Sequence, residues 1–193
     1  MSLRTLALAS LLLAPAALAQ PPTPSDAEYD AFAGDLLSVI KERGCGAERG
    51  TAGHSLAAVW LRASFHDIGT WFASNTSFGS DGSLLNELER AENKGLVRAD
   101  MPDRHTAHGL GNISAADSIG LGAVVSIAAC GGPQVNFFTG RSDLLGFDTG
   151  ATNPAGLIPL PEQSNATIIA RMQSMGLEDV DIVALSSGSH TLG

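Results

Sequence analysis

The sequence predicts a mainly α-helical domain with long loops. Several segments repeat apolar residues at helical spacing, with capping residues at their starts or glycines at their ends. Strand signals are sparse, and the best of them covers residues 135–138. A length of 193 residues with 44% hydrophobic residues fits one globular domain.

The first two helices follow from apolar spacing and terminal signals. Apolar residues at helical spacing run from Asp26 to about Arg43, and Gly44 ends the segment. A second helix is expected to begin near His54 or Ser55 and to end at Gly69.

Later elements are punctuated by polar and glycine-rich loops. Residues 69–86 have a loop composition, and a short helix is expected over 84–90. Ser114 with Asp117 three residues later resembles a helix start, and the apolar run that follows reaches Ala129. Two more helices are expected over 162–175 and 178–187.

Residues 1–19 have the pattern of a secretory signal peptide, which leaves residues 20–193 as the domain. Arg4 precedes an apolar stretch too short to span a bilayer, and a small-x-small cleavage site ends at Ala19. We therefore expect a secreted, extracellular protein without a membrane partner. In that oxidising compartment Cys45 and Cys130 are expected to form a disulfide. Sequons for glycosylation begin at Asn75, Asn112 and Asn165.

The charge balance argues against nucleic-acid binding. The formal net charge is -9 at pH 7, so the protein would repel a phosphate backbone.

Arg62 and His66 form the first candidate site. Their spacing of four places them on one helix face, where the cation disfavours protonation of the imidazole. A neutral imidazole is what a general base requires. The alternative is a surface arginine and a hydrogen-bonded core histidine.

Two further segments have polar residues suited to ligands. Asp67 and the loop around Asp81 and Ser83 offer oxygen atoms suited to calcium, although a solvated turn has the same composition. Near the end of the sequence, His190 follows an apolar run among small residues, which would leave room for a flat cofactor. A lone histidine there is more often a cap or a core residue.

Together these segments resemble the secreted fungal haem peroxidases of the plant-type superfamily, the group of the lignin and manganese peroxidases. The resemblance covers residues 26–193 and implies the distal half of the peroxidase fold plus the start of its proximal half. Its most specific parts are Arg62-x-x-Phe65-His66-Asp67, residues 79–83, Glu87 with Asn93, residues 138–141 and residues 185–193.

The resemblance implies a role for each residue of the haem pocket. His66 would be the distal base, Arg62 the distal arginine, and Asn93 the amide that holds the second nitrogen of His66. The Glu87 carboxylate would support Asn93. His190 would be the proximal iron ligand of haem b. Two more residues would contact the cofactor or its edge: Phe65 and Pro159.

Calcium is the second cofactor that the resemblance implies. The distal ion would be bound by Asp67, Gly79, Asp81 and Ser83, and Thr191 would be the first ligand of a proximal ion. The Cys45–Cys130 pair also matches a bridge of the fungal group. The family's domain continues past the proximal histidine, so we expect a truncated sequence here.

The implied function is a haem peroxidase that reduces hydrogen peroxide and oxidises small phenolic or aromatic donors by single electrons, as a monomer. A different class of function is a catalytically silent fragment that binds calcium but not haem. A third hypothesis, a zinc hydrolase using His66 and Asp67, is disfavoured because adjacent helical residues diverge by about 100 degrees.

Overall fold

A computed structural model of the protein describes residues 23–46, 55–96, 101–104, 113–144 and 150–192. The named helices, in chain order, are α1 (Asp26–Arg43), α2 (Leu56–Ile68), η1 (Ser83–Asn86), η2 (Ala91–Asn93), α4 (Ala115–Ala129), α5 (Asn165–Ser174) and α6 (Asp179–Gly188). The expected signal peptide, residues 1–19, and the sequon at Asn112 lie outside the described residues.

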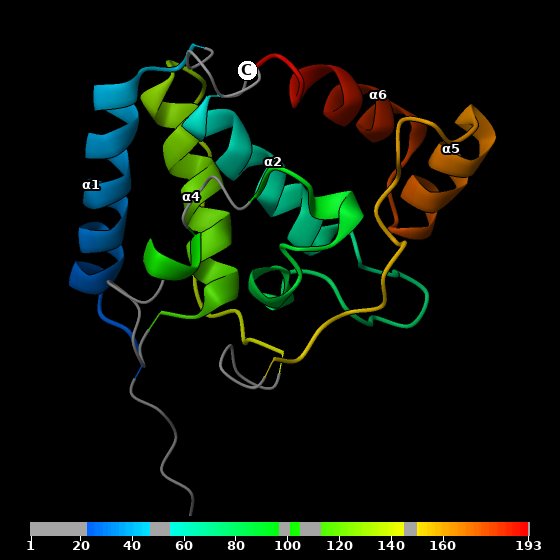
Figure 1. Cartoon of the computed structure of the whole chain (residues 1–193), viewed down its shortest axis with the longest axis horizontal. Coiled ribbons are helices and arrows are strands. Elements are labelled where there is room, and N and C mark those ends of the chain that lie inside the picture. Colours follow the sequence, from blue (N-terminus) through cyan, green and yellow to red (C-terminus); the bar gives the residue numbers. More distant parts are fainter. Residues whose placement is uncertain (1–22, 47–54, 97–100, 105–112, 145–149, 193) are drawn as a thin grey trace, which may run out of the picture.

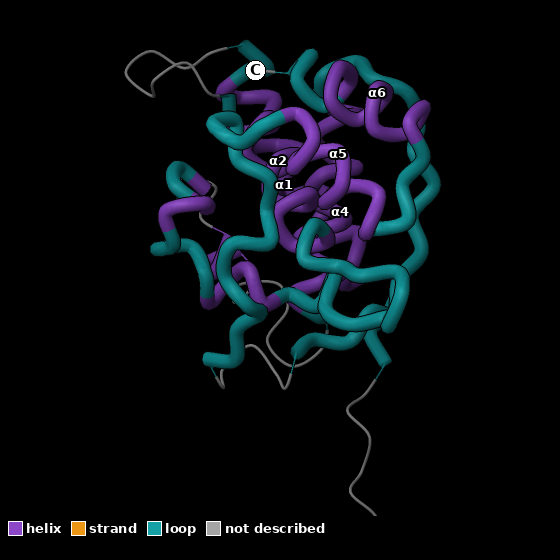
Figure 2. Tube along the Cα trace, turned by 90° about the vertical axis from the view of Figure 1, so that its right-hand side faces the viewer, coloured by secondary structure: helices purple, strands orange, loops and turns teal. Residues whose placement is uncertain are grey.

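The helices form two groups with α2 at their centre. α1, α2 and α4 pack against one another, and α5 and α6 lie on the opposite side of α2 from α1 (Figure 1). Long loops connect these groups, and the described residues contain no strand (Figure 2). The predicted helical fold class is therefore confirmed.

Capping residues fix where the helices begin. The side chain of Ser55 accepts a hydrogen bond from Ala58 N–H at the start of α2, and Ser114 does the same for Asp117 in α4. At the start of α5, Ser164 accepts from Thr167 N–H, so that helix begins three residues later than residue 162, where the sequence predicted it. The predicted helices over 26–43 and 178–187 match α1 and α6 within one residue.

Two local predictions were wrong. Residues 135–138 form no strand, because no neighbouring strand pairs with them in the described part of the chain, whose one bridge joins Phe72 to Ser77. Instead the Phe137 ring packs near Gly120 of α4. The helix expected over 84–90 is reduced to the short 3-10 helix η1 followed by turns.

The core lies where α1, α2 and α4 meet. Phe32, Leu36 and Ile40 of α1 are buried in one cluster with Trp60 of α2, whose ring meets Phe32 edge to face at 6.0 Å between centroids. Gly122 lets α4 approach α2 closely, because a Cβ atom there would lie 2.1 Å from Cε3 of Trp60. This contact sets the spacing of the two helices.

The predicted disulfide is present and closes the same bundle. Cys45 follows α1 and Cys130 follows α4, with their Cα atoms 5.6 Å apart. The loop that it closes spans 85 residues. By the chain-entropy model a loop of that length stabilises the folded state by about 4 to 5 kcal/mol.

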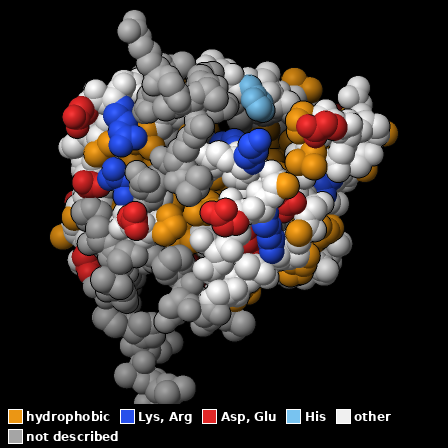
Figure 3. All heavy atoms as spheres, viewed as in Figure 1, with side chains coloured by type: hydrophobic (Ala, Val, Ile, Leu, Met, Phe, Trp, Pro, Cys, Tyr) orange, Lys and Arg blue, Asp and Glu red, His pale blue; other side chains and the backbone are white. Residues whose placement is uncertain are grey.

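The outer helices expose apolar side chains. In the space-filling view, hydrophobic side chains gather on the right-hand side, where α5 and α6 lie (Figure 3). Val180 and Val183 of α6 are 70% and 67% exposed, and Ile169 of α5 is 42% exposed. Within the ranges that the structure describes, no helix has the length and hydrophobicity needed to cross a membrane.

The contact between α2 and α4 predicts a large effect of one methyl group. Changing Gly122 to Ala should lower the free energy of unfolding by about 1 to 3 kcal/mol, since the new Cβ overlaps the buried Trp60 ring. Urea denaturation followed by circular dichroism measures the change.

Gly34 provides the matched control for this substitution. It lies on an exposed position of α1, and a Cβ there would meet no heavy atom within 4 Å. Gly34→Ala should therefore leave stability unchanged or raise it by up to about 1 kcal/mol through helix propensity. Equal stability of the two variants would contradict the packing described.

Candidate active site

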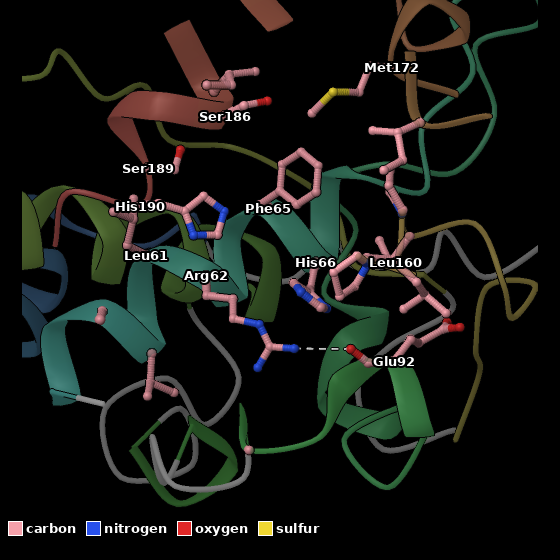
Figure 4. A pocket seen from close by; sticks show the side chains of 18 of the residues that line it. Leu61, Arg62, Phe65, His66, Glu92, Leu160, Met172, Ser186, Ser189 and His190 are labelled. Atoms are coloured by element: carbon pink, nitrogen blue, oxygen red, sulfur yellow. Dashed lines mark hydrogen bonds between the residues drawn. The ribbon is translucent and has the colours of Figure 1, made fainter. Parts of the chain in front are cut away.

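A cleft of about 640 Å³ opens between α2 and the segment formed by residues 158–161, α5 and α6. Most of its lining residues are apolar. Figure 4 shows the side chains of Arg62, His66 and His190 around this one cavity. The expected haem-contact residues Phe65 and Pro159 line it as well. The fold thus brings together five predicted residues from three segments that are far apart in the sequence.

His66 is fixed by a buried hydrogen bond to Asn93. The two residues are 7% and 1% exposed, and His66 Nδ1 lies 2.7 Å from Asn93 Oδ1. The Asn93 amide nitrogen donates to the main-chain oxygen of Glu87 at 2.9 Å, which leaves Oδ1 as the acceptor. His66 therefore has its proton on Nδ1, and Nε2 is free to accept one.

The surroundings of His66 keep its ring neutral. Burial is the main reason that the pKa of His66 is lowered to about 4; the charge of Arg62 acts in the same direction, and the Asn93 hydrogen bond opposes both. The Phe65 ring stands edge to face with the imidazole at 6.3 Å between centroids. A neutral, oriented imidazole has the properties of a general base.

Arg62 is positioned by main-chain oxygens. Its Nη1 donates to Lys94 O at 2.8 Å, and its Nη2 donates to Glu92 O at 3.1 Å, as the dashed line in Figure 4 shows for Glu92. Both oxygens belong to the segment around η2 that also carries Asn93. One short segment therefore orients both Arg62 and His66.

The expected role of the Glu87 carboxylate needs correction. Asn93 is bonded to the main-chain oxygen of Glu87, not to its side chain. The carboxylate faces the other way, where it accepts the Asn153 N–H at 2.5 Å and pairs with Arg90 at 3.0 Å. Because Asn153 and Arg90 hold the buried Glu87 carboxylate, the main-chain oxygen of Glu87 is the one that accepts the hydrogen bond from Asn93.

The loop after α2 gathers the expected calcium residues. The Asp67 carboxylate is buried and accepts the N–H groups of Gly82 and Leu84 at 3.2 and 3.4 Å. Burial is the main reason that the pKa of Asp67 is raised to about 7; the charge of Asp81 adds to this effect, and the N–H groups of Gly82 and Leu84 oppose it. These two carboxylates are therefore close enough to repel each other.

Besides the two carboxylates, this loop has hydroxyl and main-chain groups that could take part in a cation site. Ser83 donates its N–H to Asp81 Oδ1 at 3.2 Å, and Gly79 donates its N–H to Thr70 Oγ1 at 2.9 Å. The described residues contain no cluster of three or more His, Cys, Asp or Glu side chains suited to a metal ion. A cation here would need carbonyl and hydroxyl oxygens beside Asp67 and Asp81, a donor set suited to calcium.

His190 and Thr191 follow α6 and are exposed. His190 lines the cleft, whereas the Thr191 hydroxyl donates to Ser187 O at 3.2 Å. The hydroxyl of Thr191 is therefore bonded to the last turn of α6, the helix that it follows.

Sequence reasoning missed three residues that organise the site. Asn153 is buried, and its Nδ2 donates to Asp81 Oδ2 at 3.1 Å and to Thr70 Oγ1 at 3.0 Å. The Glu92 carboxylate accepts a hydrogen bond from the N–H of Gly156. The Arg171 guanidinium donates to three main-chain oxygens, those of Gly69, Trp71 and Leu157. Most of these bonds involve main-chain atoms, for which no local sequence pattern exists.

Comparison with known proteins shows the family of this chain. Residues 43–193 match the family model described as Peroxidase. The chain belongs to the peroxidase family. It is 34% identical over 179 residues to L-ascorbate peroxidase 5, peroxisomal, of Arabidopsis thaliana, covering 87% of this chain and 56% of that protein.

Two fungal proteins have the same sequence identity to this chain, 34%. A WSC domain-containing protein of Arthroderma benhamiae is 34% identical over 139 residues, which cover 71% of this chain and 18% of that protein. An Aspergillus fumigatus protein named "Putative heme-binding peroxidase" is 34% identical over 171 residues, covering 86% of this chain and 50% of its own. The chain thus spans about half the length of the two peroxidases.

The hydrogen bond between His66 and Asn93 predicts a stability cost when it is removed. Asn93→Ala would leave Nδ1–H of His66 buried without its acceptor, so the free energy of unfolding should fall by about 1 to 3 kcal/mol. Urea denaturation measures this change. Asn136, which is exposed, gives the control, and Asn136→Ala should stay within about 0.5 kcal/mol of the unsubstituted protein. If the two variants were equally stable, the bond would not hold His66.

Proposed function

We propose that this peroxidase-family chain handles hydrogen peroxide in a cleft that binds haem between His66 and His190. The observation that carries the proposal is the convergence of Arg62, a neutral His66 and His190 on one mostly apolar cleft. A flat, hydrophobic cofactor fits a space of that size and lining. His190 would hold the iron, and Phe65 and Pro159 would contact the cofactor or its edge.

When bound, haem would supply the electrons that break the peroxide oxygen–oxygen bond and would recover them one at a time from a donor. His66 Nε2 accepts a proton from the peroxide and returns it to the departing oxygen, which leaves as water. The Arg62 guanidinium donates hydrogen bonds to the negative charge that grows on that oxygen. Asn93 keeps the His66 proton on Nδ1 throughout, because Oδ1 offers only an acceptor.

The finer assignments belong to the same proposal. Small phenolic or aromatic molecules are the donors that suit an apolar entrance near Pro159, and the molecule acts as a monomer. Secretion is supported by the disulfide, which persists in oxidising compartments. The disulfide is the observed feature that supports the secreted fungal class within the family.

A calcium ion in the loop after α2 is proposed as the second cofactor. Asp67, Asp81 and Ser83 supply side-chain oxygens, and Gly79 lies in the same loop. A cation would offset the repulsion between the two carboxylates, one of which is buried. Because Asp67 directly follows His66, the ion would also stabilise the end of α2.

Two histidine variants test the division of roles. His66→Ala should slow the reaction with peroxide by about 100-fold or more while haem stays bound, because only the proton acceptor is lost. His190→Ala should weaken haem retention itself, since the iron ligand is removed. Stopped-flow absorbance and a haem titration measure the two effects. Equal loss of haem in both variants would refute these roles, and no binding by the unsubstituted chain would favour the calcium-binding fragment.

Calcium binding predicts a change in melting temperature. Calcium at 100 times its dissociation constant should stabilise the folded state by about 2.7 kcal/mol, and Asp81→Asn should remove most of that gain. Asp30→Asn, at an exposed position of α1, makes the same charge change away from the loop and should keep the gain. A melting temperature that does not respond to calcium or chelator in the folded protein would contradict the loop assignment.

A further inference from the structure

One segment, residues 151–160, runs along the cleft without regular structure, and we call it the strap. Polar side chains from residues 86–92 hold its main chain at its start. Asn86 Nδ2 donates to Ala151 O at 3.0 Å, and Arg90 Nη2 donates to Asn153 O at 2.7 Å. The far end of the strap lines the cleft through Ile158, Pro159 and Leu160.

The strap is held from both walls just before it reaches the cleft. From the η2 side, Glu92 Oε2 accepts the N–H of Gly156 at 2.8 Å. From the α5 side, Arg171 Nε donates to the carbonyl of Leu157 at 2.7 Å. Pro159 lies two residues beyond this pair of bonds. Its position at the cleft therefore depends on them.

Glu92 also contacts Arg62, one of the residues proposed to act on peroxide. Its main-chain oxygen accepts the Nη2 hydrogen bond of Arg62 at 3.1 Å. Its side chain is 12% exposed and, within the described residues, is the one carboxylate that lines the cleft. Figure 4 places Glu92 and Leu160 on the same side of the cavity, away from His190. One residue thus joins the strap to the segment that orients Arg62.

We propose that Glu92 is a positioning residue that sets the opening of the cleft to reducing donors by holding the strap at Gly156. This inference rests on the proposed peroxidase function. In this proposal the hydrogen bond keeps Pro159 and Leu160, which line the cleft, in positions that favour small aromatic donors over bulky ones. Without it the strap can move away from η2, and that preference weakens.

Three variants separate the hydrogen bond from the charge. Glu92→Ala removes both the acceptor and the charge, whereas Glu92→Gln removes the charge and keeps an oxygen that can accept the Gly156 N–H. Glu89→Ala, at an exposed position in the same segment, is the control for lost negative charge. The Arg62 contact involves a main-chain oxygen of Glu92, which all three variants retain.

The first readout needs no turnover. Hydrogen exchange of a peptide covering residues 150–160 should be about fivefold faster at Gly156 in Glu92→Ala, as expected for one lost hydrogen bond. Glu92→Gln and Glu89→Ala should exchange within about twofold of the unsubstituted protein. Unchanged exchange in Glu92→Ala would overturn the proposal.

The second readout is donor preference in the haem-loaded protein, with guaiacol as the small donor and ABTS as the bulky one. The ratio of kcat/KM for guaiacol to that for ABTS should fall about fivefold in Glu92→Ala, with the larger change in KM. Glu92→Gln should restore the ratio. If Glu92→Gln lowered this ratio as much as Glu92→Ala, the charge of Glu92 and not its hydrogen bond to the strap would set the donor preference, and the proposal would be overturned. Faster exchange with an unchanged ratio would make the bond merely structural, which also overturns the proposal.

Failure of the underlying function gives a different result. If the unsubstituted, haem-loaded protein oxidised neither donor with peroxide, the proposed function would fail and the donor role of Glu92 with it. The exchange experiment would then report the strap contact alone.

Discussion

The two faces of α2 constrain the rest of the molecule. One face buries Trp60 and Ala63 against α1 and α4, and Gly122 determines how closely α4 can approach. The other face presents Arg62 and His66 to the cleft. Because both sets belong to one rigid helix, the packing of the core fixes the height and direction of the groups proposed to handle peroxide.

A buried polar network connects the cleft to the loop after α2. His66 is bonded to Asn93, and Asn93 to the main chain of Glu87. The Glu87 carboxylate accepts the N–H of Asn153, whose amide donates to Asp81. The first three of these bonds are buried, so a displacement at one end would leave polar groups unpaired at the next. The loop and the cleft are therefore parts of one hydrogen-bonded unit.

Much of the fold could be predicted from local pattern, whereas most of the site depends on long-range contacts. Helical spacing and capping residues located the helices, and the spacing of Arg62 and His66 placed both on one face. That His190 shares their cleft followed only from a family resemblance, because nothing local relates two distant segments. The resemblance also identified Glu87 without revealing which of its oxygens faces Asn93. Glu92 was missed because its partner, the Gly156 N–H, has no side-chain signature.

The proposed function requires that this chain alone forms a cleft able to bind haem and react with peroxide. A haem titration of the purified chain, followed by absorbance in the Soret region and then by a pulse of peroxide, tests it most directly. We expect a saturable Soret shift at one haem per chain and a further spectral change with peroxide. Absence of stoichiometric binding by folded protein would contradict it.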